Sequence, residues 1–140
     1  MKKQILIALL VLHIIGAAQT FAKIPQTADS IDAFWAKFKA AVAAGNKAAV
    51  AQMTIFPVTM PYGVRAIKTK AELASRFKQV FHGETNAAKC FESAKPQKEP
   101  KRPREFTVGC DNGSGQEVII YRFVLTKSGW KFKAFDNINE

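Results

Sequence analysis

The spacing of apolar residues changes once along this chain of 140 residues, near Gly83, and this change limits the fold more than any other feature. Before Gly83 the apolar residues recur at intervals of three and four, as they do on one face of a helix. After Gly83 they alternate with polar residues, as they do in a strand with one buried face. Helices followed by a run of strands predict an α+β fold in which the helices pack on a sheet.

Two helices are expected near the start of the periodic region. The stretch "SIDAFWAKFKAAVAAGN" has one apolar face, begins after a suitable N-cap at Ser30 and is ended by Gly45. Asn46 can then cap a second, shorter helix.

A third helix is expected in "TKAELASRFKQVFHG", where Thr69 and Glu72 have the spacing of a capping box and Gly83 ends the pattern. The preceding stretch "TIFPVTMPYGV" contains two prolines, which a central strand does not tolerate. We therefore expect it to be an edge strand or an extended segment that turns at residues 61–63.

The segment after Gly83 is expected to form a meander of about four antiparallel strands. The stretches "AAKCFESA" and "EFTVGC" are short strand candidates, and "EVIIYRFVLTKSGWKFKAFDNI" holds two longer strands joined at residues 127–129. With the proline-containing segment at its edge, the predicted curved sheet has four to five strands, covered by three N-terminal helices.

The basic stretch "KPQKEPKRPR", residues 95–104, lies between two cysteines. If Cys90 sits opposite Cys110 in an antiparallel pair, the stretch becomes the tip of a hairpin. A disulfide closing this 21-residue loop would then contribute about 3 kcal/mol to the free energy of unfolding in an oxidising compartment.

The basic side chains of this predicted hairpin tip have two interpretations. They are Lys98, Lys101, Arg102 and Arg104. If the tip is a solvated loop, these charges discourage another chain from pairing with the edge of the sheet. If the tip is a contact surface, they attract an acidic partner. The stretch has no aromatic residue to stack on bases, so a nucleic-acid partner is not expected.

Residues 1–22 have the composition of a cleaved secretory signal peptide, with two lysines, an apolar run and small residues at Thr20 and Ala22. The run is shorter than the roughly 20 residues that cross a bilayer, although an uncleaved N-terminal anchor is the alternative. Cleavage would leave residues 23–140 as one domain and lower the formal charge from +10 to +8. We expect a periplasmic or secreted protein with no transmembrane anchor.

Several catalytic and cofactor-binding classes have no basis in the sequence. After removal of the signal peptide the chain keeps one histidine, His82, and two cysteines, too few for a histidine-rich zinc site or a zinc ribbon. A phosphate-binding glycine loop, a Gly-x-Ser-x-Gly elbow and a His-Glu-x-x-His pair are also missing. We therefore expect neither a cofactor nor a metal, and we interpret His82 as a residue that caps its helix.

The junction "AVAAGNKAAVAQM", the "FP" segment and the final "GWKFKAFD" resemble small exported bacterial members of the nuclear-transport-factor-2-like superfamily. The resemblance implies a cystatin-like α+β cone over residues 30–138, in which a bent sheet wraps the first helix. It also implies a pocket at the open end of the cone and is compatible with a homodimer formed through the outer face of the sheet. Members include isomerases, cyclases, dehydratases and non-catalytic binding proteins, so the fold alone selects no function.

Asp136 is the candidate catalytic base, because it follows the apolar row of the last strand at a period of two. Tyr121 or Tyr62 is the candidate donor. The alternative places Asp136 at the strand end, exposed or paired with Arg122.

Trp130 and Phe132 are candidates for lining the pocket, although their spacing fits a filled core equally well.

These observations favour an exported, non-catalytic module that binds a small apolar molecule or an envelope protein. One alternative is a small-molecule isomerase or cyclase that uses Asp136 and a tyrosine. Another is a toxin-neutralising or inhibitor protein that acts through the basic hairpin, residues 95–104.

Overall fold

The computed structural model of the chain describes residues 29–60, 65–83, 85–113, 115 and 117–139. Its helices are α1 (Ile31–Ala43), α2 (Lys47–Gln52), α3 (Lys70–Ser75), α4 (Phe77–His82) and α5 (Ala87–Ser93). Its strands are β1 (Thr54–Thr59), β2 (Gln97–Lys98), β3 (Glu105–Asp111), β4 (Glu117–Thr126) and β5 (Gly129–Asn139). The predicted signal peptide, residues 1–22, and the turn predicted at residues 61–63 lie outside the described residues. None of the described helices is long and apolar enough to cross a membrane.

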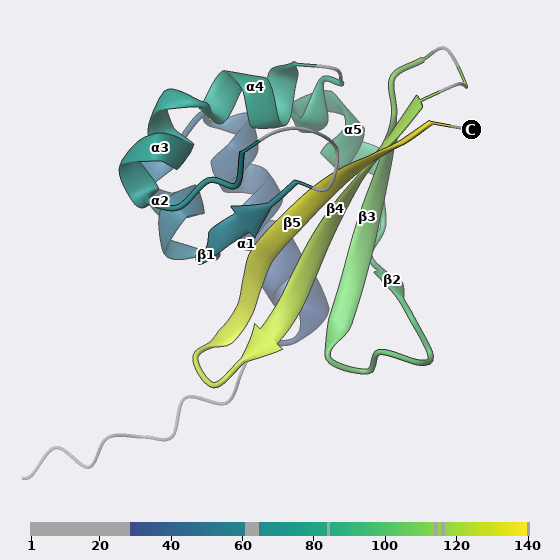
Figure 1. The fold of residues 1–140 in the computed structure, drawn as a ribbon. Coiled ribbons are helices and arrows are strands. Elements are labelled where there is room, and N and C mark those ends of the chain that lie inside the picture. Colours follow the sequence, from purple (N-terminus) through teal and green to yellow (C-terminus); the bar gives the residue numbers. More distant parts are fainter. Residues whose placement is uncertain (1–28, 61–64, 84, 114, 116, 140) are drawn as a thin grey trace, which may run out of the picture.

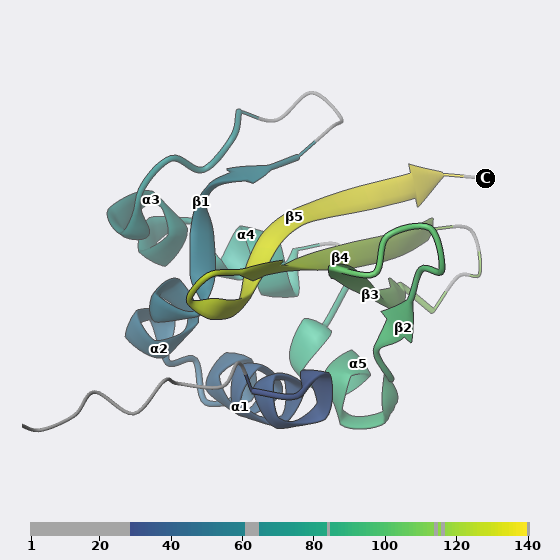
Figure 2. The same cartoon turned by 90° about the horizontal axis from the view of Figure 1, so that it is seen from below.

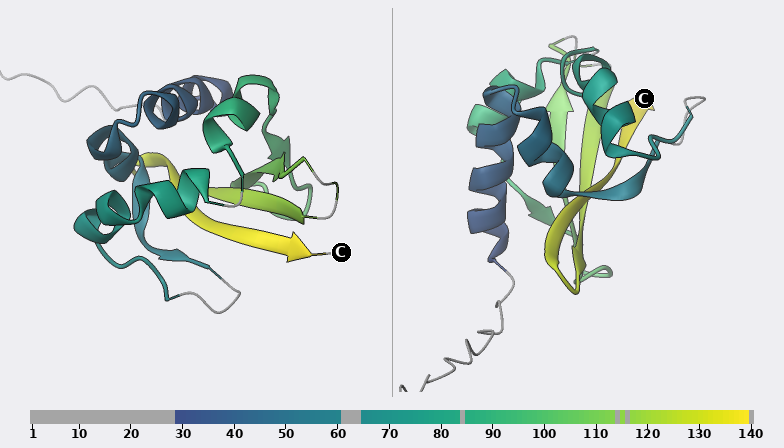
Figure 3. Two further views of the ribbon diagram at one scale, coloured as in Figure 1. Left: turned by 90° about the horizontal axis from the view of Figure 1, so that it is seen from above. Right: turned by 90° about the vertical axis from the view of Figure 1, so that its left-hand side faces the viewer.

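The strands form one sheet in the order β1-β5-β4-β3-β2, and the helices pack on its inner face (Figures 1 and 2). This confirms the predicted α+β fold and the position of β1 at the sheet edge. The predicted antiparallel meander is confirmed for β3, β4 and β5, and β2, a strand that was not predicted, pairs antiparallel with β3. In contrast, β1 pairs with β5 in parallel. The sheet is therefore mixed. Figure 3 shows α1 running beside the sheet.

The two predicted N-terminal helices are confirmed together with their caps. The hydroxyl of Ser30 accepts a hydrogen bond from the backbone N–H of Ala33 at 3.2 Å. Gly45 has a φ of 62°, a left-handed conformation that favours glycine, and it ends α1. The side chain of Asn46 accepts from the N–H of Ala49 at 3.0 Å and so begins α2.

The third predicted helix is present but divided at Arg76 into α3 and α4. Thr69 caps α3 as expected, because its hydroxyl accepts from the N–H of Glu72 at 3.1 Å. At the break, the Arg76 guanidinium donates to the carbonyl oxygen of Arg65 at 3.0 Å. Gly83 follows α4, where a Cβ would lie 2.6 Å from the carbonyl oxygen of Gln79.

The stretch "AAKCFESA" was predicted to be a strand, and this prediction is wrong, because it forms α5. The Asn86 side chain accepts from the N–H of Lys89 at 3.2 Å and caps the helix. Ala87 and Phe91, four residues apart, are both buried, which is the spacing of one helical face. Along the chain, α5 therefore follows the third predicted helix and precedes strands β2 to β5.

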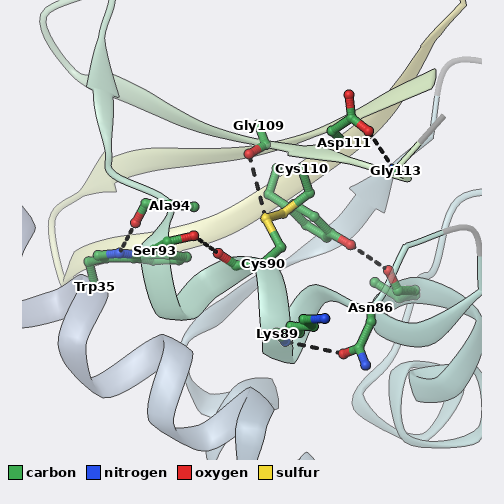
Figure 4. The surroundings of a disulfide bond; sticks show 12 residues. Trp35, Asn86, Lys89, Cys90, Ser93, Ala94, Gly109, Cys110, Asp111 and Gly113 are labelled. Carbon is green, nitrogen blue, oxygen red and sulfur yellow. Dashed lines mark hydrogen bonds between the residues drawn. A yellow bond between two sulfur atoms is a disulfide. The ribbon is translucent and has the colours of Figure 1, made fainter. Parts of the chain in front are cut away.

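The predicted disulfide between Cys90 and Cys110 is present, with 20 residues of sequence separation. It joins α5 to β3 rather than two facing strands, so the predicted strand pairing of the cysteines is wrong (Figure 4). The basic stretch still forms a hairpin, because Gln97 and Lys98 of β2 pair with β3.

Aromatic rings fill the space between the helices and the sheet. Phe38 of α1 is fully buried, and its ring centroid lies 4.9 Å from that of Phe123 and 5.6 Å from that of Phe132. The rings of Phe106 and Phe123 stack at 4.6 Å. The other aromatic side chains with less than 2% exposure are Phe81, Phe91 and Tyr121. The inner face of the sheet is therefore a packed core.

Candidate functional site

A β-bulge in β5 decides which side chains face the interior. Phe132 pairs with Phe123, but the next pair is Ala134 with Arg122, so Lys133 is inserted without a partner on β4. One extra residue moves all following side chains to the other face. Asp136 therefore lies on the outer face, and the prediction that it shares a face with Trp130 and Phe132 is wrong.

Tyr121 lies on the inner face, opposite to Asp136. Its ring is stacked with that of Phe135 at a centroid distance of 6.2 Å, and its hydroxyl donates to the carbonyl oxygen of Val80 at 3.0 Å. The structure therefore does not bring the candidate base and this candidate donor together. Tyr62, the other candidate donor, lies outside the described residues.

Asp136 belongs instead to a chain of charged side chains across the outer face. Its Oδ2 lies 4.0 Å from Nη2 of Arg122, and Nη1 of Arg122 lies 3.1 Å from Oε2 of Glu105. The same Glu105 oxygen lies 3.3 Å from Nη1 of Arg102 in the basic hairpin. This arrangement matches the alternative in which Asp136 pairs with Arg122.

The environment of Asp136 disfavours its charged form. Burial raises the pKa of Asp136, and the positive charge of Arg122 opposes this effect only in part. Its Oδ1 is enclosed and has no hydrogen-bond partner among the described residues. A buried acceptor without a partner adds to the cost of keeping this carboxylate charged.

The outer face also carries half-buried aliphatic side chains. Val118, Ile120 and Val124 alternate with the inner-facing residues of β4. Gly109 of β3 lies beside them, since a Cβ there would be 3.3 Å from Cδ1 of Ile120. All the described helices lie on the other side of the sheet (Figure 2). We call Val118, Ile120, Arg122, Val124 and Asp136 the outer patch.

The basic hairpin is less free to bind a partner than its sequence indicates. Arg102 is paired with Glu99 and Glu105, each at 3.3 Å. Arg104 donates to the carbonyl oxygen of Leu125 at 2.9 Å. Lys98 and Lys101 are exposed, and neither makes an ion pair within the described part of the chain.

The two aromatic residues predicted to line a pocket have different surroundings. Phe132 is fully buried in the core, whereas Trp130 lines a groove of about 440 Å³ at the surface. Between α4 and the sheet lies a smaller cavity of about 90 Å³, lined by residues that include Thr85, Ile119 and Tyr121. Sequence reasoning did not identify the surface groove, because its residues come from α1, α2, β5 and the segments beside them, which are distant in the sequence.

His82 is the last residue of α4, as predicted, and its ring centroid lies 6.2 Å from that of Phe77. Within the described ranges, His, Cys, Asp and Glu side chains form no group of three or more that could hold a metal ion.

No family model matches the sequence, and no curated protein matches it. Similar solved structures include an NTF2-like protein with a cystatin-like fold from Novosphingobium aromaticivorans, with a TM-score of 0.41 and 13% identity over 76% of this chain and 77% of that one. Another is an NTF2-like protein of unknown function from Shewanella oneidensis, with a TM-score of 0.44 and 11% identity over 76% and 94%. A third is SalBIII, an epoxide hydrolase/cyclase-like enzyme of pyran ring formation in salinomycin, with a TM-score of 0.45 and 15% identity over 78% and 89%.

Two of these three structures are NTF2-like proteins, and the first of them has a cystatin-like fold. The similarity concerns the fold.

Proposed function

We propose that the protein is an exported, non-catalytic module that binds a protein partner at the outer face of its sheet. The observation that carries this proposal is the placement of Asp136 and Tyr121 on opposite faces. An isomerase or cyclase of the predicted kind needs a carboxylate base and a hydrogen-bond donor that face one apolar cavity. Among the described residues, Asp136 and Tyr121 do not face one cavity.

The packed interior favours a protein partner over a small apolar molecule. Pockets for small molecules generally measure about 300–1,000 Å³. The cavity between α4 and the sheet measures about 90 Å³, and the groove of about 440 Å³ lies at the surface and not in the interior. Phe38, Phe123 and Phe132 occupy the space in which a cone-shaped fold would hold a ligand.

The outer patch has the chemistry of a protein-binding surface. Ile120 and its aliphatic neighbours can lose contact with water, and the ion pair between Arg122 and Glu105 sits beside them. Arg122, which is only about three-quarters buried, offers a charged group at the edge of these aliphatic side chains. We expect the partner in the cell envelope, because residues 1–22 predict export and the disulfide suits an oxidising compartment. A second copy of this chain is another partner that this surface would accept.

The proposal is tested by capture of partners from an envelope extract. Ile120→Glu places a charge in the outer patch, and we expect it to lower recovery of the partner at least tenfold. The control is Lys78→Glu, because Lys78 is exposed on α4, on the other side of the sheet. Equal recovery by Ile120→Glu and the native protein, both folded by circular dichroism, would exclude the outer patch as the binding surface.

A further inference from the structure

A groove of about 440 Å³ lies where α1 begins, α2 ends and β4 turns into β5. The groove is lined by Asp29, Phe34, Lys37, Gln52, Met53, Lys127, Ser128, Gly129, Trp130 and Lys131. None of these residues belongs to the outer patch.

The charged side chains give the groove an excess of positive charge, since three lysines face one carboxylate. Nζ of Lys37 is paired with Oδ2 of Asp29 at 2.5 Å. Nζ of Lys131 donates to the carbonyl oxygen of Gln52 at 2.8 Å, at the end of α2. Lys127 has no ion pair within the described part of the chain, so at least one full positive charge is uncompensated.

Apolar side chains contribute the rest of the lining. Phe34 and Trp130 are 5% and 8% exposed, and Met53 is half-buried beside them. The ring of Trp130 packs edge-on against that of Phe106, with their centroids 5.1 Å apart. A ligand in the groove would therefore meet fixed aromatic edges as well as ammonium groups.

The turn that carries Lys127 is ordered by its own hydrogen bonds. The hydroxyl of Thr126 donates to the carbonyl oxygen of Gly129 at 2.8 Å and accepts from the N–H of Ser128 at 3.1 Å. Gly129 has a φ of 95°, a left-handed conformation that this turn requires. A ligand would therefore not have to order this part of the groove on binding, which favours affinity.

We propose that this groove binds a small amphipathic anion, in which a carboxylate, sulfonate or phosphate is attached to an aromatic or alkyl group. The anionic group pairs with Lys127 and with Lys37, and the apolar group lies against Trp130, Phe34 and Met53. Inorganic anions alone would leave the apolar lining unused, and neutral apolar molecules would leave the charge of Lys127 unpaired. The groove is a second binding site, and its occupancy does not depend on the function proposed for the outer patch.

The test compares two fluorescent probes that share one ring system. 8-Anilinonaphthalene-1-sulfonate carries a sulfonate, and N-phenyl-1-naphthylamine does not. We expect the purified protein to bind the sulfonated probe at least about tenfold more tightly, since an ammonium group pairs with the anion. Raising the salt concentration should reduce this difference, because the pairing charges are partly exposed.

Three single substitutions assign the binding to the groove. Lys127→Met removes the unpaired charge and should weaken binding of the sulfonated probe about tenfold, while binding of the neutral probe stays the same. Asp29→Asn releases Lys37 from its carboxylate and should tighten binding of the sulfonated probe severalfold. Lys78→Met, remote from the groove on α4, should change neither.

A general loss of structure would weaken binding in both variants, whereas the proposal expects weaker binding in Lys127→Met and tighter binding in Asp29→Asn. Circular dichroism checks that each variant is folded. Equal affinity for the two probes, or undiminished binding of the sulfonated probe by Lys127→Met, would overturn the proposal. Capture of a protein partner by the outer patch should be the same in native protein and in Lys127→Met.

Discussion

Tyr121 and Asp136 lie on opposite faces of the same sheet, because the bulge at Lys133 shifts the end of β5 by one residue. Without the bulge, the alternation of β5 would carry Asp136 into the interior beside Phe132. With it, Asp136 reaches Arg122 on the outer face, and Phe135 stacks on Tyr121 inside. One inserted residue thus separates the two groups that a catalytic site would combine.

Asp136→Asn should stabilise the protein near neutral pH. Because burial raises the pKa of Asp136, the folded protein binds this proton more tightly than the unfolded chain does. The free energy of unfolding of the native protein therefore falls as the pH rises from the unfolded pKa through the folded one. Asparagine has no such dependence, so the variant should be more stable than the native protein above that interval and equally stable below it.

Urea denaturation of both proteins at about pH 7 and about pH 3 measures this difference. A variant that is less stable than the native protein at the higher pH would show that attraction to Arg122 outweighs the effect of burial.

Removal of the disulfide should destabilise the protein substantially. It constrains a loop with a sequence separation of 20 residues, and it fixes α5 on β3. We expect Cys90→Ala with Cys110→Ala to lower the free energy of unfolding by about 3 kcal/mol. Native protein treated with reductant is the matched control and should unfold at a similar urea concentration. An unchanged midpoint in both samples would mean that the crosslink adds nothing to stability.

Phe38→Ala should be one of the most damaging substitutions in the core. The ring is fully buried among other aromatic rings, so its loss should cost about 3–5 kcal/mol. It should also create an apolar cavity that accepts benzene, which would raise the melting temperature of the variant but not of the native protein. Phe38→Leu, which removes less volume, should lose less stability. Stabilisation of the native protein by benzene would mean that its interior is not filled.

Charge reversal in the basic hairpin should leave binding at the outer patch intact. The double variant Lys98→Glu with Lys101→Glu changes two exposed side chains that make no ion pair in the described part of the chain. Its free energy of unfolding should therefore differ from that of the native protein by less than about 0.5 kcal/mol. Capture of the partner should remain the same. If this double variant loses the partner while Ile120→Glu retains it, the hairpin is the contact surface, as expected for an inhibitor of an acidic protein.

The helices that carry their own caps could be predicted from the sequence. Ser30, Asn46 and Thr69 each accept the backbone hydrogen bond that their position indicated. The same reasoning failed for α5, although Asn86 caps it and Ala87 and Phe91 have helical spacing. That segment is short enough for its apolar residues to fit a strand as well, and its packing decided the outcome.

The candidate site was less predictable, because it depends on register. Nothing in "WKFKAFD" marks Lys133 as the inserted residue, and alternation alone places Asp136 on the wrong face. The groove depends on tertiary structure in the same way, since Lys37 and Lys127 are far apart in the sequence and line one groove only in the folded chain.

The central claim, that this protein binds through its surface and not within its interior, is tested most directly by native mass spectrometry of protein purified from its own cells. We predict a complex with a second polypeptide, or with a second copy of the chain, that is absent for Ile120→Glu. No neutral apolar molecule should be released on denaturation. A monomer that releases such a molecule, equally from native protein and from Ile120→Glu, would contradict the account.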